Sequence, residues 1–249
     1  MTRSISHTAN ETAGRSTDWN QVNWRTVYRR VEKLRHRIFR ATKEGDYRRV
    51  RSLQKLMLRS YSNTLVSVRQ VTQLNKGKVT AGLDKVIVKT SEKRGHLVDA
   101  IQAYTPWKVK PAKRVYIPKH NGKTRPLGIP TIRDRVMQAK VKNALEPEWE
   151  AKFEATSYGF RPGRGCHDAI EKIFGIANAR TRKVWVLDAD IQGCFETISH
   201  DHLLRQIQGF PARSLIKAWL KAGYVDRGRY HHRVAGTPQG GVVSPLLAN

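Results

Sequence analysis

RVYIPKHNGKTRPLGI, residues 114–129, contains the clearest β-structure signal in this chain. Two runs typical of β-strands, 114–118 and 123–129, flank an Asn-Gly pair, and Asn-Gly between such runs is a strong hairpin signal. Helical patterns lie on both sides of the hairpin, over 93–104 and 131–153. The combination predicts a mixed α/β (α+β) fold.

A glycine-rich basic loop, SYGFRPGRG at 157–165, follows the helix predicted at 131–153, in which Pro147 predicts a kink or an end. The glycine spacing is neither that of a P-loop nor that of a dinucleotide-binding fingerprint. The loop therefore indicates neither kind of nucleotide site. A helix is expected after it, at about 166–178.

A short apolar run ends in two acids in KVWVLDADIQGCF, residues 183–195. The run predicts a strand, and alternate residues share one face of a strand, so Asp188 and Asp190 would lie on the same side. A strand that ends in carboxylates presents the hard oxygen ligands that Mg²⁺ prefers. An isolated Asp-x-Asp pair is more often a helix cap or a turn, so both interpretations stay open.

The remaining C-terminal patterns are helical, with one strand. Ser199 and Asp201 are typical of the cap and first turn of a helix. An amphipathic helix is expected around 215–220, and 229–234 are typical of a strand. A last helix is expected to begin at Gln239.

Basic residues concentrate in two helices predicted near the N-terminus. Apolar residues recur at helical spacing from Trp24, Gly45 ends the first helix, and the second continues to about residue 72. Between Arg25 and Arg59 there are 13 Lys or Arg residues and three acids. Helical geometry places eight of the cations outside the apolar stripes: Arg29, Arg30, Lys33, Arg37, Arg48, Arg51, Lys55 and Arg59. A charge run is often only a solvated face, but this density repels itself unless an anion covers it, which favours contact with RNA or DNA.

The whole chain is strongly basic, with 47 Lys plus Arg, 20 Asp plus Glu and a net charge of +27 over 249 residues. Such an excess favours a polyanionic partner. No segment approaches the roughly 20 apolar residues of a membrane span, so no membrane partner is expected. Two cysteines, Cys166 and Cys194, are too few for a disulfide framework or a Cys-rich zinc site, and a cytoplasmic location is expected.

Four blocks occur in a characteristic order along the chain. They are RVYIPKHNGKTRPLGIPTIRDRVMQ at 114–138, SYGFRPGRGCHDAI at 157–170, VLDADIQGCFETI at 186–198 and GTPQGGVVSPLLAN at 236–249. In this order the chain resembles the N-terminal half of a group II intron reverse transcriptase, also called a maturase. The resemblance covers residues 19–249, nearly the whole chain.

The resemblance implies a right-hand polymerase fold. The fingers would carry the β-hairpin, and an incomplete palm would have an antiparallel sheet backed by helices. The implied divisions are a disordered tail at 1–18, a basic helical RNA anchor at 19–74, fingers at 75–182 and a partial palm at 183–249.

The resemblance also implies roles for individual residues. Asp190 matches the catalytic palm aspartate that binds both Mg²⁺ ions of the two-metal mechanism, with the Ile191 carbonyl as a further ligand. Lys119 and Arg125 match the fingers cations that bind the incoming triphosphate. By themselves, these two cations are equally typical of an exposed hairpin tip.

Three further positions match the nucleotide pocket of the family. Phe195 matches the aromatic steric gate against a ribose 2′-hydroxyl, and Gln239 matches a residue that lines the pocket. Gly240, with the glycine after it, would let the backbone approach the substrate closely. Alternatives stay open, because Phe195 is also a plausible core aromatic and Gln239 a plausible helix cap. For Asp188, direct metal ligation is not expected.

The chain also departs from the family pattern. Gln192 and Glu196 stand where Lys and Asp are commoner, and TAGLDK at 80–85 replaces a Pro-Gly-Val-Asp-Gly-like turn. The family completes its metal site with a Tyr-x-Asp-Asp hairpin, whereas this sequence has no Asp-Asp pair and no acid after Asp226. We therefore expect residues 1–249 alone to lack polymerase activity. The chain would then be a truncated form, the product of an interrupted reading frame, or one half of a split protein.

The function implied is that of a group II intron RNA-directed DNA polymerase that also supports splicing and retrohoming. Its cofactor would be Mg²⁺, and its partners intron RNA, template RNA, primer DNA, deoxynucleotide triphosphates and the C-terminal half of the enzyme in cis or in trans. Two alternatives stay open: a non-catalytic RNA-binding fragment, and a reverse transcriptase of a CRISPR-associated, retron or phage-defence system. A homodimer is also open.

Overall fold

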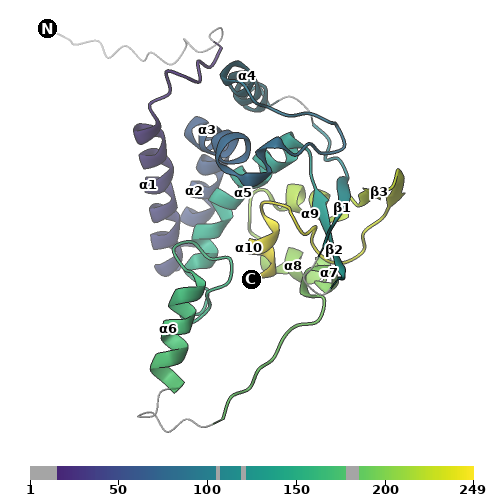
Figure 1. Ribbon diagram of the computed structural model, residues 1–249. Coiled ribbons are helices and arrows are strands. Elements are labelled where there is room, and N and C mark those ends of the chain that lie inside the picture. Colours follow the sequence, from purple (N-terminus) through teal and green to yellow (C-terminus); the bar gives the residue numbers. More distant parts are fainter. Residues whose placement is uncertain (1–15, 105–106, 119–121, 178–184) are drawn as a thin grey trace, which may run out of the picture.

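The computed structural model describes residues 16–104, 107–118, 122–177 and 185–249 (Figure 1). The helices are α1 (Trp24–Lys43), α2 (Tyr47–Arg59), α3 (Tyr61–Arg69), the π-helical η1 (Gln70–Leu74), the 3-10 helix η2 (Lys76–Val79), α4 (Ser91–Gln102), α5 (Ile132–Glu150), α6 (Cys166–Ala177), α7 (Cys194–Thr197), α8 (His200–Gln206), α9 (Arg213–Lys221) and α10 (Ser244–Ala248). The strands are β1 (Ala112–Pro118), β2 (Thr124–Ile129), β3 (Tyr224–Asp226) and β4 (Arg229–His231). This combination confirms the predicted α/β (α+β) class.

Local capping chemistry sets the N-terminal helices. Asn23 caps α1 by accepting a hydrogen bond from the Thr26 N–H, and Gly45 follows the helix with φ of +73°. The second predicted helix is wrong as a single element, because it is divided at Ser60. There the backbone is extended, and the Ser60 hydroxyl accepts from the Asn63 N–H to start α3.

Helix α5 is the central element of the molecule and contributes to two hydrophobic clusters. One cluster joins α5 to α1, α2, α8, α9 and α10, with Ile38, Met57 and Ile216 fully enclosed. The other joins α5 to α3 and α4 and encloses Trp19 and Val68. Figure 1 shows α5 between α1 and α2 on one side and α8, α9 and α10 on the other. Pro147 lies inside the last turns of α5 and does not end the helix.

The predicted hairpin is confirmed as β1 and β2, which pair antiparallel from Lys113 opposite Ile129 to Pro118 opposite Thr124. The sheet order is β2-β1-β3-β4. The antiparallel sheet was expected within residues 183–249, and there β3 and β4 do pair antiparallel. What was not expected is that β3 also pairs with β1 in parallel, with Ala112 opposite Tyr224. Strand β3 and its antiparallel partner β4 therefore extend the β1–β2 hairpin.

The strand predicted at the start of 183–195 is wrong for the residues that the structure describes. Residues 185–191 form neither a strand nor a helix, and Trp185 and Leu187 are 94% and 92% exposed. A strand gains its stability from pairing, and the four strands of the described sheet come from other segments. Helix α6, which precedes this segment, has no buried residue and projects from the helical body (Figure 1).

Two further expectations need correction or restriction. The last helix begins at Ser244, not at Gln239, because residues 239–240 form a turn and residues 242–243 a bend. The predicted tail at 1–18 lies mostly outside the described residues, and its last part is ordered. The Thr17 N–H donates to the Asp99 carboxylate over 3.0 Å. Gly95 permits this contact, since a Cβ there would lie 2.2 Å from the Thr17 carbonyl oxygen.

Among the described residues, no helix is both long enough and apolar enough to cross a membrane.

Candidate functional site

The loop GTPQGG, residues 236–241, lies against strand β2 of the hairpin. The Gly128 N–H donates to the Gln239 carbonyl over 2.6 Å. Gly240 has φ of +103°, and a Cβ atom there would lie 2.6 Å from the Gly128 carbonyl oxygen and 2.9 Å from the Leu127 side chain. Backbone conformation and space both favour glycine, so the close approach of loop and hairpin depends on it.

Helices α5 and α8 hold the other sides of the same loop. The Gln138 side chain, 2% exposed, accepts a hydrogen bond from the Val242 N–H over 2.7 Å. A Cβ on Gly241 would lie 3.1 Å from the same amide oxygen. In α8, His200 Nε2 lies 2.8 Å from the Gly236 carbonyl oxygen. The loop is therefore held by the hairpin, by α5 and by α8.

Phe195, on α7, lies beside this loop. Its carbonyl accepts a hydrogen bond from the Thr237 N–H over 2.7 Å. Gly236 has φ of +78°, and a Cβ there would lie 2.6 Å from the same carbonyl oxygen. The Phe195 ring meets the Phe160 ring edge-on, with 6.0 Å between centroids. The structure therefore places Phe195 and the loop that contains Gln239 side by side.

Of the two predicted fingers cations, only Arg125 lies among the residues that the structure describes. Arg125 is exposed and lies opposite Ile117 in the hairpin. It shares one face of β2 with Leu127, because alternate residues of a strand point to the same side, and Leu127 is the side chain that approaches Gly240. Lys119 lies outside the described residues.

Asp190 lies in the exposed segment before α7. Its Oδ1 atom accepts a hydrogen bond from the N–H of its neighbour Ile191 over 2.9 Å. Ile191 is 72% exposed. Within the described part of the chain, neither Asp190 nor Asp188 forms a hydrogen bond or ion pair with Arg125, Phe195 or Gln239, so the structure does not join them to the loop.

The residues present do not complete a site for two divalent ions. No group of three His, Cys, Asp or Glu side chains that could hold a metal occurs within 16–104, 107–118, 122–177 and 185–249. Divalent ions of this kind need several oxygen ligands, and a pair of them needs bridging carboxylates. Asp190 supplies one carboxylate, and the Ile191 carbonyl would add a neutral oxygen.

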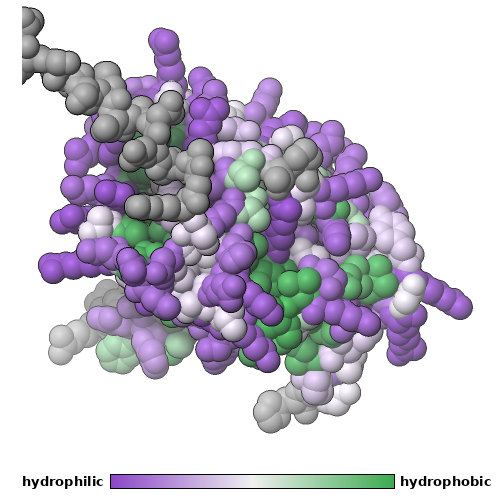
Figure 2. Space-filling view, turned by 90° about the horizontal axis from the view of Figure 1, so that it is seen from above, coloured by the Kyte–Doolittle hydropathy of each residue, from purple (hydrophilic) through white to green (hydrophobic). Residues whose placement is uncertain are grey.

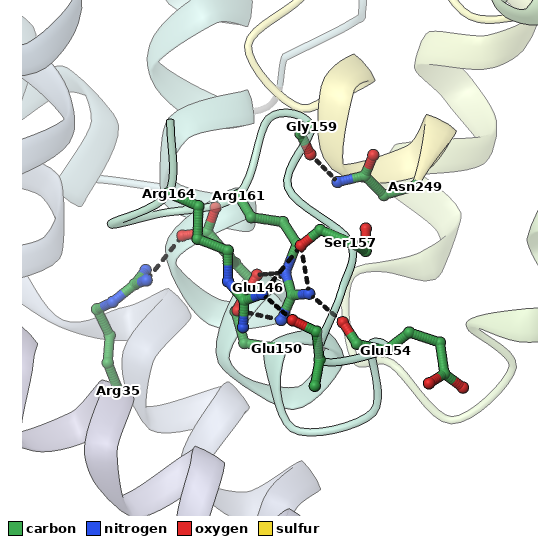
Figure 3. A network of polar contacts seen from close by, with 10 residues as sticks. Arg35, Glu146, Glu150, Glu154, Ser157, Gly159, Arg161, Arg164 and Asn249 are labelled. Carbon is green, nitrogen blue, oxygen red and sulfur yellow. Dashed lines mark hydrogen bonds and ion pairs between the residues drawn. The ribbon is translucent and has the colours of Figure 1, made fainter. Parts of the chain in front are cut away.

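A buried arginine orders the glycine-rich loop at 157–165, as Figure 3 shows. Arg161, 5% exposed, donates from Nε to Glu150 Oε1 over 3.0 Å and from Nη2 to Glu150 Oε2 over 2.9 Å. Its Nη1 atom donates to the carbonyls of Glu154 and Ser157. A bidentate charge-assisted pair is strong and directional, so Arg161 fastens the loop to the end of α5.

The same loop positions Phe160 beside Phe195. Phe160 has φ of +56°, an unfavourable region for a bulky residue, and its side chain is 64% exposed. The Asn249 side-chain amide donates to the Gly159 carbonyl over 2.8 Å, which ties the loop to α10 (Figure 3). Sequence reasoning missed the role of Arg161, because the pattern showed only a basic loop and burial separates Arg161 from the other loop cations.

A basic face covers the outer sides of α1 and α2. All eight cations predicted outside the apolar stripes are exposed: Arg29, Arg30, Lys33, Arg37, Arg48, Arg51, Lys55 and Arg59. Hydrophilic side chains cover most of the face seen in Figure 2. The basic face therefore has the charge and exposure needed to contact a polyanion.

Comparison with protein families shows which family the chain belongs to. Residues 117–249 match the family described as reverse transcriptase (RNA-dependent DNA polymerase), and residues 19–101 match the N-terminal domain of reverse transcriptase. The chain belongs to the reverse transcriptase family. The match at 117–249 includes β2, α7 and the GTPQGG loop. Reverse transcriptases as a family use divalent metal ions.

Similar proteins come from bacteria and from a yeast intron. Protein YkfC of Escherichia coli K12 is 39% identical over 200 residues, which are 74% of this chain and 51% of the relative. Group II intron-encoded protein LtrA of Lactococcus lactis is 40% identical over 185 residues, 70% of this chain and 30% of the relative. An uncharacterised 91 kDa protein in the cob intron of Schizosaccharomyces pombe is 41% identical over 143 residues, which are 56% of this chain and 17% of the relative.

These relatives confirm the resemblance to group II intron reverse transcriptases and maturases. The chain spans about half the length of YkfC and less than a third of LtrA.

Proposed function

We propose that this chain forms the fingers and part of the palm of a group II intron RNA-directed DNA polymerase that supports splicing and retrohoming. The observation that carries the proposal is the docking of the GTPQGG loop on β2, with Phe195 bonded to the same loop. The proposed divisions are an RNA anchor at 19–74, fingers at 75–182 and a partial palm at 183–249. The site of action proposed is the cytoplasm.

In this proposal the nucleotide pocket lies where the hairpin, the loop and α7 meet. Arg125, with Lys119, binds the triphosphate of an incoming deoxynucleotide. Gln239 and the backbone at Gly240 line the pocket, which the close contact with Gly128 supports. The Phe195 ring excludes a ribose 2′-hydroxyl by its bulk. The primer DNA and the template RNA pass the same place.

We propose Mg²⁺ as the metal, with Asp190 and the Ile191 carbonyl among its ligands. When bound, the metal ions would activate the primer hydroxyl and neutralise charge on the triphosphate. Because the described residues do not complete such a site, further carboxylates are required. We propose that the C-terminal half of the enzyme, in cis or in trans, supplies them.

The second candidate function is RNA binding without catalysis, and the exposed cations of α1 and α2 favour it. This function needs no metal site, so the 249-residue chain could perform it without the C-terminal half of the enzyme. Intron RNA is the expected ligand, because LtrA is named as intron-encoded. A homodimer, and the CRISPR, retron and phage-defence alternatives, have no supporting observation in the structure.

Salt-dependent RNA binding tests the RNA-anchor role. If six or more phosphates are contacted, affinity falls roughly 10³-fold or more between 50 and 200 mM salt, because each phosphate contact releases counterions. Changing Arg29, Arg30, Lys33 and Arg37 to Gln should reduce this salt slope. A matched control changes four exposed cations elsewhere, Lys217, Lys221, Arg227 and Arg229, and keeps the slope. A flat salt response in the unmodified chain would contradict the RNA-anchor role.

A further inference from the structure

A hollow of about 570 Å³ lies where α2, α4, α5 and α9 meet. Its floor is one face of α5. Its walls are the end of α2, Ile101 and Tyr104 at and after the end of α4, Trp107, and the start of α9. The residues that line it are Lys55, Leu58, Arg59, Ile101, Tyr104, Trp107, Arg133, Met137, Lys140, Val141, Pro211, Ala212 and Leu215. We name this hollow the Lys140 pocket. Its volume is in the range of small-molecule sites.

The lining of the Lys140 pocket carries charge of one sign. Four of its residues are Lys or Arg, and none is Asp or Glu. Lys140 is 2% exposed, and within the described part of the chain no carboxylate forms an ion pair with its ammonium group. Burying a cation without a counter-ion is costly. Burial accordingly lowers the pKa of Lys140 to about 8.

The remaining walls are apolar and aromatic. Trp107 packs on Trp219 with 6.5 Å between ring centroids, and the Arg133 guanidinium lies 5.7 Å from the Trp107 ring centroid. Tyr104 is 63% exposed at the rim, with φ of +49°. Cations beside aromatic and apolar surface suit a ligand that combines an anion with a flat ring. A nucleotide has this combination, and proteins bind unstacked RNA bases on aromatic side chains.

The Lys140 pocket is continuous with the basic face. Lys55 and Arg59 line the pocket and are also the last exposed cations of the row on α2 that begins at Arg48. An RNA strand that follows this row therefore passes the mouth of the pocket. This continuity favours RNA over an acidic protein segment as the occupant.

We propose that the Lys140 pocket holds one unstacked nucleotide of the bound RNA, with a phosphate beside Lys140 and Arg59 and the base against Trp107. The proposal rests on the proposed RNA binding, and it adds a discrete site to a charged surface. The RNA phosphate acts as the counter-ion that Lys140 lacks among the described residues.

Photo-crosslinking of single-stranded RNA that contains 5-iodouridine tests the pocket directly. With the full 249-residue chain, we expect crosslinked peptides to contain Tyr104 or Trp107. Lys140→Met should lower the yield of these peptides at least tenfold. It should leave the fold intact or raise the melting temperature, because it removes an unpaired buried cation. Lys142→Met is the matched control: it loses one cation from the same helix, where Lys142 pairs with Glu146, and its yield should stay within twofold.

A second variant keeps the test decisive if Lys140→Met does not fold. Arg59 is exposed, so Arg59→Gln should fold normally and also reduce the crosslink. The chain could bind RNA in a salt-dependent way but crosslink only outside the pocket, with yields that neither variant changes. That result would overturn the proposed nucleotide site and leave RNA binding by the basic face standing. Absence of RNA binding would overturn both proposals. Polyglutamate could bind in a way that depends on Lys140, while RNA gives no crosslink at the pocket. That result would assign the pocket to an acidic protein and overturn the RNA proposal.

Discussion

At the scale of single residues, the site depends on glycines that permit close backbone contacts. Gly240 combines φ of +103° with a neighbouring carbonyl 2.6 Å from the place of a Cβ atom. Gly228, in the turn between β3 and β4, has φ of +82° but nothing within 4 Å of that place. The two glycines therefore separate the cost of backbone conformation from the cost of a steric clash.

We predict that Gly240→Ala lowers the free energy of unfolding by about 3 kcal/mol, or detaches the loop from β2. Gly228→Ala should cost only about 1 kcal/mol, because it has conformational strain without a clash. Urea denaturation of both variants measures the difference. Equal losses would show that the contact with Gly128 contributes nothing.

Lys140 gives a residue-scale prediction of pH dependence. Burial lowers its pKa from the ordinary 10.5 to about 8, so between these values the unfolded chain binds more protons than the folded chain. The free energy of unfolding should therefore rise with pH across this window, by up to about 3 kcal/mol. Lys140→Met should lack this rise. Denaturation of both proteins at pH 7.5 and pH 10.5 tests it, and parallel changes in the two would contradict a lowered pKa.

At the scale of elements, structure that depends on local chemistry could be predicted from the sequence. The Asn-Gly turn predicted the hairpin, and Ser199 predicted the start of α8. Ser60 could have predicted the break between α2 and α3, but the apolar stripe continues across it and hid the cap.

Elements that depend on distant partners could not be predicted in this way. Residues 185–188 have strand composition, yet a strand forms only beside another strand, and within the described residues none pairs with them. Strand β3 was missed, because its three residues carry too little pattern and are held by parallel pairing with β1. Arg161 was missed as a structural residue for the same kind of reason, since Glu150 gives it its role.

The Arg161 network gives an element-scale prediction. Arg161→Gln should lower the free energy of unfolding by about 3 kcal/mol and loosen residues 157–165, because Glu150 keeps its charge without its partner. Arg164→Gln is the control: its guanidinium is less buried and donates to the carbonyls of Ala155 and Ser157, so the loss should be about 1 kcal/mol. Denaturation and hydrogen exchange of the loop measure both effects. Equal behaviour of the two variants would argue against Arg161 as the fastening residue.

At the scale of the whole molecule, the chain belongs to the reverse transcriptase family and combines a basic helical face with a hairpin on which the GTPQGG loop docks beside Phe195. The described residues contain no complete metal site. We therefore expect the proposed RNA binding to be separable from the proposed polymerisation. We predict no primer extension by residues 1–249 above the level of an Asp190→Asn control.

The most direct measurement is RNA-templated primer extension by the product of the whole reading frame to which these residues belong, with Mg²⁺ present. The account predicts deoxynucleotide incorporation that Asp190→Asn abolishes, and Phe195→Ala should increase the use of ribonucleotides because the gate is removed. Extension that survives Asp190→Asn, or a Phe195→Ala enzyme with unchanged discrimination between the two sugars, would contradict the nucleotide site proposed here.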